Sequence, residues 1–177
     1  MAITKIQSES LNLADTYDFT GTVTGAGGVN TPAFEAYLSA NQTIVNETDT
    51  KAQNNIEVYD TDNAYDNSSN YRFTPQTAGK YFVYGRTASD SSAGNCREVK
   101  TMIFKNGSVI ARSFVNFHGN DGEGASPIVT AIVDMNGSSD YVELFGRHDS
   151  ADGTNDTKFQ GGNSEIYTIF GAYKIIE

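Results

Sequence analysis

Short runs in which apolar and polar residues alternate recur along the chain from about residue 32 onward. A period of two predicts β-strands, because successive side chains of a strand point to opposite faces of a sheet. The runs are separated by loops rich in Gly, Asn, Asp and Ser, which is typical of a sandwich or barrel. The predicted strands are PAFEAYLS (32–39), NNIEVYD (54–60), NYRFT (70–74), KYFVYGRTA (80–88), EVKTMIF (98–104), SVIARSFVNF (108–117), PIVTAIVDM (127–135), DYVELFGR (140–147) and EIYTIFGAYKII (165–176).

Two Asn-Gly pairs lie between apolar runs and predict tight turns. Both Asn106-Gly107 and Asn136-Gly137 can take the positive φ angles that two-residue hairpins need. We therefore expect 98–104 to pair with 108–117, and 127–135 to pair with 140–147.

Two of the predicted strands are apolar on both faces, which is unusual for a small antiparallel sheet with one wet side. In the first, Tyr81 and Val83 alternate with Phe82 and Tyr84. In the closing strand, one face carries Tyr167, Ile169, Tyr173 and Ile175, and the other carries Ile166, Phe170, Ala172 and Ile176. Either loops of the same monomer cover the second face, or neighbouring copies of the chain do, and two such strands favour oligomerisation.

The first 31 residues differ from the rest. Their apolar residues are sparse and lie among Ser, Thr and Asp: Ile3, Ile6, Leu11, Leu13, Phe19 and Val23. The segment ends in GTVTGAGG (21–28), a flexible joint. We therefore expect two parts, an extended N-terminal arm over 1–31 and a compact all-β head domain over 32–177.

Composition and charge agree with an all-β chain and limit its partners. Ten Tyr, ten Phe and 17 Gly favour strands and turns. Lysine and arginine number 12 against 22 aspartates and glutamates, and a net charge of -10 disfavours nucleic acid and anionic membranes as partners. The sequence has neither an apolar run of about 18 residues nor a recognisable export signal.

Catalytic signatures are not found in the sequence. There is no nucleophile elbow, zinc-protease motif or phosphate-binding loop. The only histidines, His118 and His148, each follow a predicted strand in a polar loop, so we expect solvated side chains. Cys96 is the only cysteine, and no disulfide can form within the chain. These observations predict a protein that is not an enzyme.

The acidic stretch DTDNAYD is the best candidate for a metal site. Asp60, Asp62 and Asp66 could supply hard oxygen ligands for calcium. The spacing departs from the EF-hand pattern, because Ala64 stands where a ligand belongs. We interpret the stretch as an acidic turn, with calcium as the alternative and no other cofactor expected.

Residues 33–176 resemble the superfamily of complement globular-head and tumour-necrosis-factor-like trimeric jelly rolls. The matching pieces follow the family's order, although Val83 and Gly85 stand where the family has aromatic residues. They are Ala33-Phe34-Glu35-Ala36, Asp60 with Tyr65 after four intervening residues, Phe73 followed after five residues by Gly79-Lys80-Tyr81, and Phe170-Gly171-Ala172-Tyr173.

This resemblance implies an antiparallel jelly-roll sandwich that forms a homotrimer, with aromatic strands packed around the threefold axis. Such an assembly would cover the second face of both two-sided strands. The residues expected in the trimer interface or the core are Tyr81, Phe82, Val83, Tyr84, Tyr167, Ile169, Phe170, Tyr173 and Ile175.

The arm over residues 1–28 is similar to N-terminal stretches of structural proteins of tailed bacteriophages. The resemblance implies a virion structural protein, made in the bacterial cytoplasm and placed on the virion surface. The arm would bind the major capsid protein or a tail or fibre protein, as a capsid decoration or a small tail or fibre appendage. The absence of a repetitive stalk favours decoration. The alternative is a receptor-binding module for host surface glycans, and a depolymerase comes third.

Overall fold

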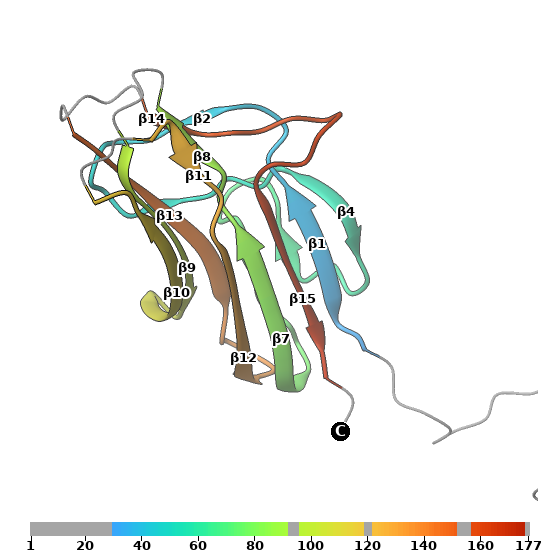
Figure 1. Ribbon diagram of the computed structural model, residues 1–177. Coiled ribbons are helices and arrows are strands. Elements are labelled where there is room, and N and C mark those ends of the chain that lie inside the picture. The colour runs from blue at the N-terminus through green and yellow to red at the C-terminus, as the bar shows by residue number, and fades with distance from the viewer. Residues whose placement is uncertain (1–29, 92–95, 119–121, 152–156, 176–177) are drawn as a thin grey trace, which may run out of the picture.

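The computed structural model describes residues 30–91, 96–118, 122–151 and 157–175, and in these ranges the regular structure is entirely β (Figure 1). The expected arm, with Ile3, Ile6, Leu11, Leu13, Phe19 and Val23, lies outside the described residues. The first described strand begins at Ala33.

The strands form two large antiparallel sheets and one small one. The first sheet has the order β12 (Ile128–Asn136), β7 (Ala78–Arg86), β15 (Ile169–Lys174), β1 (Ala33–Tyr37) and β4 (Ile56–Asp60). The second has the order β10 (Ser108–Asn116), β9 (Cys96–Lys105), β13 (Val142–Ser150), β6 (Arg72–Phe73) and β5 (Tyr65–Asp66), with β3 (Thr50–Lys51) also paired to β13. The small sheet has the order β11 (Gly124–Ala125), β8 (Ser89–Ser91), β14 (Thr157–Phe159) and β2 (Gln42–Thr43).

All nine predicted strands are present. The strands that the sequence did not predict are β2, β3, β5, β8, β11 and β14, each only two or three residues long. A run of that length cannot show a period of two, so it carries no pattern from which to predict it.

The first predicted hairpin is confirmed. Lys105 pairs with Ser108 across the turn, and β9 and β10 remain paired as far as Glu98 and Asn116. Asn106 and Gly107 have φ angles of 51° and 79°, the left-handed conformations that a two-residue hairpin requires.

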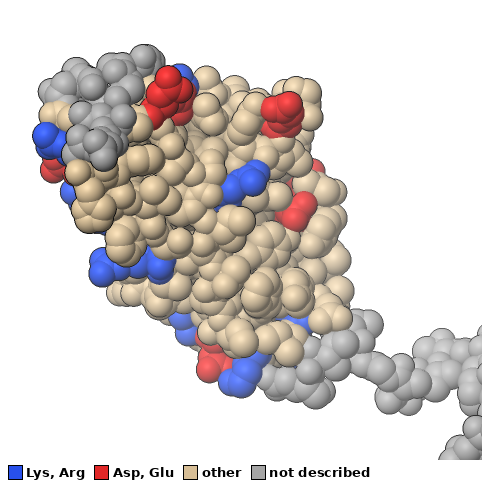
Figure 2. Space-filling model, in the orientation of Figure 1, with Lys and Arg blue, Asp and Glu red and all other residues tan. Residues whose placement is uncertain are grey.

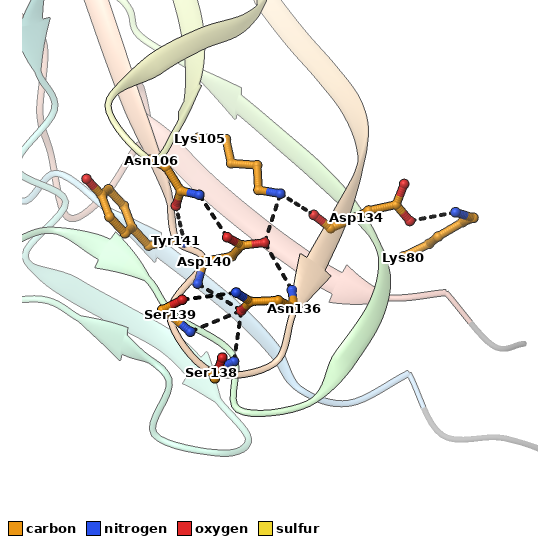
Figure 3. Close-up of polar contacts among 9 residues, drawn as sticks. All are labelled: Lys80, Lys105, Asn106, Asp134, Asn136, Ser138, Ser139, Asp140 and Tyr141. Carbon is orange, nitrogen blue, oxygen red and sulfur yellow. Dashed lines mark hydrogen bonds and ion pairs between the residues drawn. The ribbon is translucent and has the colours of Figure 1, made fainter.

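The second predicted hairpin is wrong, because β12 and β13 belong to different sheets. β12 pairs with β7, whereas β13 pairs with β9. Gly137 has a positive φ of 71°, but the Asn136 side chain accepts hydrogen bonds from the backbone N–H groups of Ser138, Ser139 and Asp140, each at 3.0 Å (Figure 3). The asparagine thus shapes a longer loop that carries the chain from one sheet to the other.

This crossover loop is tied to the β9–β10 hairpin by Asp140 (Figure 3). The carboxylate lies 2.9 Å from the Lys105 ammonium and accepts a hydrogen bond of 2.8 Å from the Asn106 amide. These contacts, Lys105 first, lower the pKa of Asp140 below its usual value. Lys105 also donates to the Asp134 carbonyl at 2.6 Å, which joins the end of β9 to β12.

The core between the two large sheets is built around an aromatic cluster. Phe34 of β1 stacks on Tyr65 and Phe73 of the second sheet, with ring centroids 4.5 Å and 4.6 Å away. Phe170 of β15 meets Phe34 edge-on at 5.1 Å. These rings and the buried aliphatic side chains around them, including Val83, Ile103, Val142 and Leu144, form one continuous core.

The two-sided strands divide as their alternation predicts. Tyr81, Val83, Phe170 and Ala172 point into the core and are fully or almost fully buried. Phe82, Tyr84, Ile169 and Tyr173 are their alternating neighbours and point to the outside of the first sheet. β15 begins only at Ile169, so Ile166 and Tyr167 lie before the strand, Ile175 lies just after it, and Ile176 is not described.

The loop after β5 is organised by the Asp66 carboxylate. One carboxylate oxygen accepts from the backbone N–H groups of Ser68 and Ser69 at 3.0 Å and 2.9 Å. The other accepts from the Ser69 hydroxyl at 2.7 Å and from the Asn70 side-chain amide at 2.7 Å. These hydrogen bonds, the one from the Ser69 N–H first, hold the pKa of Asp66 far below its usual value.

We predict that Asp66→Asn lowers the melting temperature by about 2–4 °C at neutral pH. The substitution places an NH2 group against the donors that now meet a carboxylate oxygen. A depressed folded-state pKa stabilises the fold at every pH above the unfolded pKa of about 4, and this stabilisation is lost as the pH falls towards the folded value. The deficit should therefore shrink between pH 5 and pH 2, roughly the range in which the carboxylate titrates.

The matched control is Asp62→Asn, because the Asp62 carboxylate accepts only from the neighbouring Thr61 hydroxyl among the described residues. Thermal unfolding followed by circular dichroism provides the measurement. Equal deficits for the two variants, or a deficit for Asp66→Asn that does not change with pH, would contradict the role assigned to Asp66.

Candidate functional site: an apolar open face and an adjoining edge

The outer side of the first sheet is an apolar surface, which we call the open face. Phe82 lies opposite Ile132 on β12 and Tyr173 on β15. Its ring centroid is 5.4 Å from that of Tyr173 and 6.1 Å from that of Tyr84. The open face comprises the outward side chains Tyr37, Tyr59, Phe82, Tyr84, Ile128, Ile132, Ile169 and Tyr173.

The aliphatic side chains of the open face are highly solvent-exposed. Ile128 and Ile132 have 63% and 66% of their surface accessible, and the described residues leave both side chains largely uncovered. Isolated exposed apolar residues are ordinary, but a contiguous group with aromatic rings marks an interaction surface.

Few charges interrupt the open face; Figure 2 shows a largely uncharged surface over β12, β7 and β15. The Glu35 carboxylate accepts a hydrogen bond from the Tyr84 hydroxyl at 2.6 Å. Arg86 donates to the carbonyls of Tyr167 and Ile166 at 2.7 Å and 2.5 Å. Burial and the Glu35 carboxylate raise the pKa of Tyr84, so its phenol stays protonated at physiological pH. These three polar side chains therefore already have partners.

Gly171 allows the tyrosine ring to lie flat across β15. A Cβ at this position would come within 2.4 Å of the Tyr84 ring. A larger residue at 171 would displace the Tyr84 ring. The glycine therefore allows this ring to pack closely against β15 within the open face.

An apolar edge adjoins the open face. β10 is the last strand of the second sheet and lies beside β12, the last strand of the first. Val109 and Phe114 are 46% and 55% exposed, and Ile110 and Val115 are also exposed. Within the described ranges β10 pairs only with β9, which leaves the backbone along its other side without a partner strand. We call this surface the edge surface.

The predicted interface residues therefore fall into three groups. Phe82, Tyr84, Ile169 and Tyr173 lie on the open face, and Tyr167 and Ile175 flank it. The third group, Tyr81, Val83 and Phe170, lies in the core. Ile128, Ile132 and the apolar residues of β10 were not among the predicted interface residues. The signal was present in PIVTAIVDM, where Ile128 and Ile132 alternate with the buried Val129 and Val133.

The expectation of a solvated His148 is wrong. β13 continues beyond the predicted end at residue 147, and His148 continues the inward alternation of Val142, Leu144 and Gly146. The side chain is fully buried and its Nδ1 lies 2.8 Å from the Ser89 hydroxyl. Because Ser89 is buried too, this pair has no access for a substrate. His118 is exposed, and the thiol of Cys96 is buried.

The carboxylates of the candidate calcium ligands accept hydrogen bonds from residues of their own turns. Asp60 accepts from the N–H of Tyr65 at 2.8 Å, and Asp62 accepts from the Thr61 hydroxyl. Asp66 points into the loop described above. Among the described residues, no three aspartate, glutamate, histidine or cysteine side chains converge as a metal site. Nor does that part of the chain contain a helix with the length and apolarity needed to span a membrane.

Comparisons with known proteins identify the fold. No family model matches the chain, and neither does any curated protein. The globular domain of zebrafish complement 1qA is similar in structure, with a TM-score of 0.54 and 13% identity, over 82% of this chain and 98% of that one. The Eiger tumour necrosis factor of S. frugiperda gives a TM-score of 0.54 and 8% identity, over 81% and 91% of the two chains. The protein therefore has the antiparallel jelly-roll fold that these two proteins share.

Proposed function

We propose that the protein is a non-enzymatic structural knob that assembles as a homotrimer. The observation that supports this proposal is the open face, an apolar and largely uncharged surface with exposed Ile128 and Ile132. Removing such a surface from water is favourable at about 25 cal/mol per Å².

The arrangement of the two surfaces favours a ring. A twofold dimer needs one self-complementary patch, whereas a closed ring needs two different patches that fit each other. The chain has an open face and, on β10 beside β12, an edge surface that carries Val109 and Phe114. We propose that the edge surface of one copy packs on the open face of the next. The sequence resemblance to trimeric jelly rolls favours three copies.

We propose further that the knob sits on the surface of a bacteriophage particle, held by its N-terminal arm. The arm's similarity to N-terminal stretches of phage structural proteins supports this setting. The chain enters the head at one end of the sandwich, where the Asn30 side chain donates to the Lys174 carbonyl at 2.8 Å. An arm that leaves from that end is free to reach the major capsid protein or a tail or fibre protein, and capsid decoration is the simpler form for a chain without a stalk.

We predict that the wild-type protein has three times the 19.1 kDa chain mass in solution and that Ile132→Lys is monomeric. An unpaired charge buried in an interface costs several kcal/mol, but at an exposed position it leaves the monomer intact. Light scattering and thermal unfolding provide the measurements. Val45→Lys is the control, because Val45 is 55% exposed but lies outside both surfaces. A monodisperse wild-type monomer at micromolar concentration, or a normal trimer of Ile132→Lys, would refute the proposed interface.

We predict that a chain beginning at Asn30 keeps the trimer and its melting temperature but no longer binds particles that lack the native protein. The arm's spaced apolar residues are too few to form a core, so folding should not need them. Co-sedimentation with such particles, beside the full chain, is the measurement. Undiminished binding of the shortened trimer would exclude the arm as the anchor, and failure to fold would make the arm part of the head.

A further inference from the structure

An open cavity of about 360 Å³ lies next to the residues that follow β1, at the end of that strand remote from the chain's entry into the head at Asn30. β1 carries the chain from that entry point to the opposite end of the sandwich, where β2 follows. The volume is within the range of small-molecule sites. We call it the amide cavity, and its lining residues are Leu38, Ser39, Ala40, Asn41, Gln42, Thr43, Gln53, Asn55 and Tyr71.

Two of the lining amides are fixed in orientation by hydrogen bonds. Gln42 donates from Nε2 to the Lys51 carbonyl at 2.8 Å and accepts at Oε1 from the N–H of Gln53 at 2.9 Å. Asn55 accepts at Oδ1 from the N–H of Ser39 at 3.0 Å and donates from Nδ2 to the Ser39 hydroxyl at 2.9 Å. A ligand would therefore meet preformed positions and lose little binding energy in ordering them.

The two walls of the amide cavity are also anchored in the sandwich. On one side, the buried Asn54 donates from its side-chain amide to the Ala36 carbonyl at 3.1 Å, and the Asn54 backbone carbonyl accepts from the Tyr65 hydroxyl at 3.0 Å. On the other side, Asn41 accepts at Oδ1 from the N–H of Gly161 at 3.1 Å. Both walls are thus held by other segments of the chain: β1 and β5 on one side, and the segment that follows β14 on the other.

Several polar groups of the lining have no partner among the described residues. They are the side-chain amide of Gln53, the Nδ2 group of Asn41 and the hydroxyl of Tyr71. Tyr71 also has a φ of 49°, a left-handed conformation that bulky residues seldom adopt. The backbone thus accepts an unfavourable conformation at the position that supplies the cavity's only aromatic ring.

The chemistry of the lining selects a neutral ligand with many hydroxyl groups. No charged side chain lines the amide cavity, although the chain has a net charge of -10. Amides and hydroxyls can both donate to and accept from a hydroxyl, and an aromatic ring offers an apolar plane. Without a lining cation, a phosphate or carboxylate would gain nothing there. We propose that the amide cavity binds a neutral sugar residue of a glycan, with the Tyr71 ring against its C–H face.

This site is independent of the proposed trimer and virion attachment, because none of its residues belongs to the open face or the edge surface. The test uses saturation-transfer NMR with the methyl glycosides of glucose, galactose, mannose, N-acetylglucosamine and N-acetylgalactosamine at millimolar concentration. We expect at least one to receive saturation, most strongly at its ring C–H protons. The uronic acid of a sugar that binds should have no higher affinity than the neutral sugar itself.

Two substitutions place the binding at the amide cavity. Tyr71→Gly removes the ring at a backbone conformation that glycine accepts readily, and should weaken binding at least about tenfold. Gln53→Ala changes an exposed side chain that is not needed for folding, and should weaken binding several-fold. Gln76→Ala removes an exposed amide elsewhere and should leave binding unchanged. Saturation of none of the five glycosides, or equal binding by both cavity variants and wild type, would overturn the proposal.

Discussion

The packing of Phe34 against Tyr65 and Phe73 is the contact on which the rest of the structure depends. It joins β1 of the first sheet to β5 and β6 of the second, across more than thirty residues of sequence. Phe170 closes the same cluster from β15, the strand that lies between β1 and β7. With the chain's single cysteine unable to form an internal disulfide, the head depends on this buried packing for its stability. Burial of these rings fixes which side of each strand faces inward, and so also which side faces out.

The inward orientation of these rings also explains why other apolar residues lie on the outside of the first sheet. The inner positions are already filled by Tyr81, Val83, Phe170 and Ala172, so Phe82, Ile132 and Tyr173 cannot be spare core residues. A one-residue slip of β7 would exchange the two sets, and the tight fit of Tyr84 over Gly171 opposes such a slip. The open face is therefore fixed by the register of the strands and does not result from an irregular pattern of apolar residues. The polar groups within it, Glu35 and Tyr84, are bonded to each other and could be covered at little cost.

The sequence predicted the fold where the signal was periodic and failed where pairing depended on distant contacts. The nine predicted strands and the resemblance carried by Phe34, Phe73 and Phe170 were sufficient for the jelly roll. Asn-Gly at 106 and at 136 are identical local signals, yet only the first makes a hairpin. At the second, Asp140 within the loop is held by Lys105 of β9 in the second sheet, and no local pattern records this distant contact. His148 was missed because β13 continues past its last apolar residue. The amide cavity could not be predicted, because its residues come from three separate segments of the chain without a common period.

The proposed surfaces occupy different parts of the molecule, and this separation has a physical consequence. The chain enters at one end beside Lys174, the open face and the edge surface lie along the sides, and the amide cavity lies at the far end. In a trimer attached by its arms, three amide cavities would point away from the particle on one rigid body. A single neutral sugar in a shallow site binds weakly, but three linked sites act on one polysaccharide with a high effective concentration. Because the lining carries no charge, that binding would respond little to salt, unlike attraction steered by the acidic surface. Trimer assembly would then convert a weak site into useful adhesion, because it links three copies of the amide cavity.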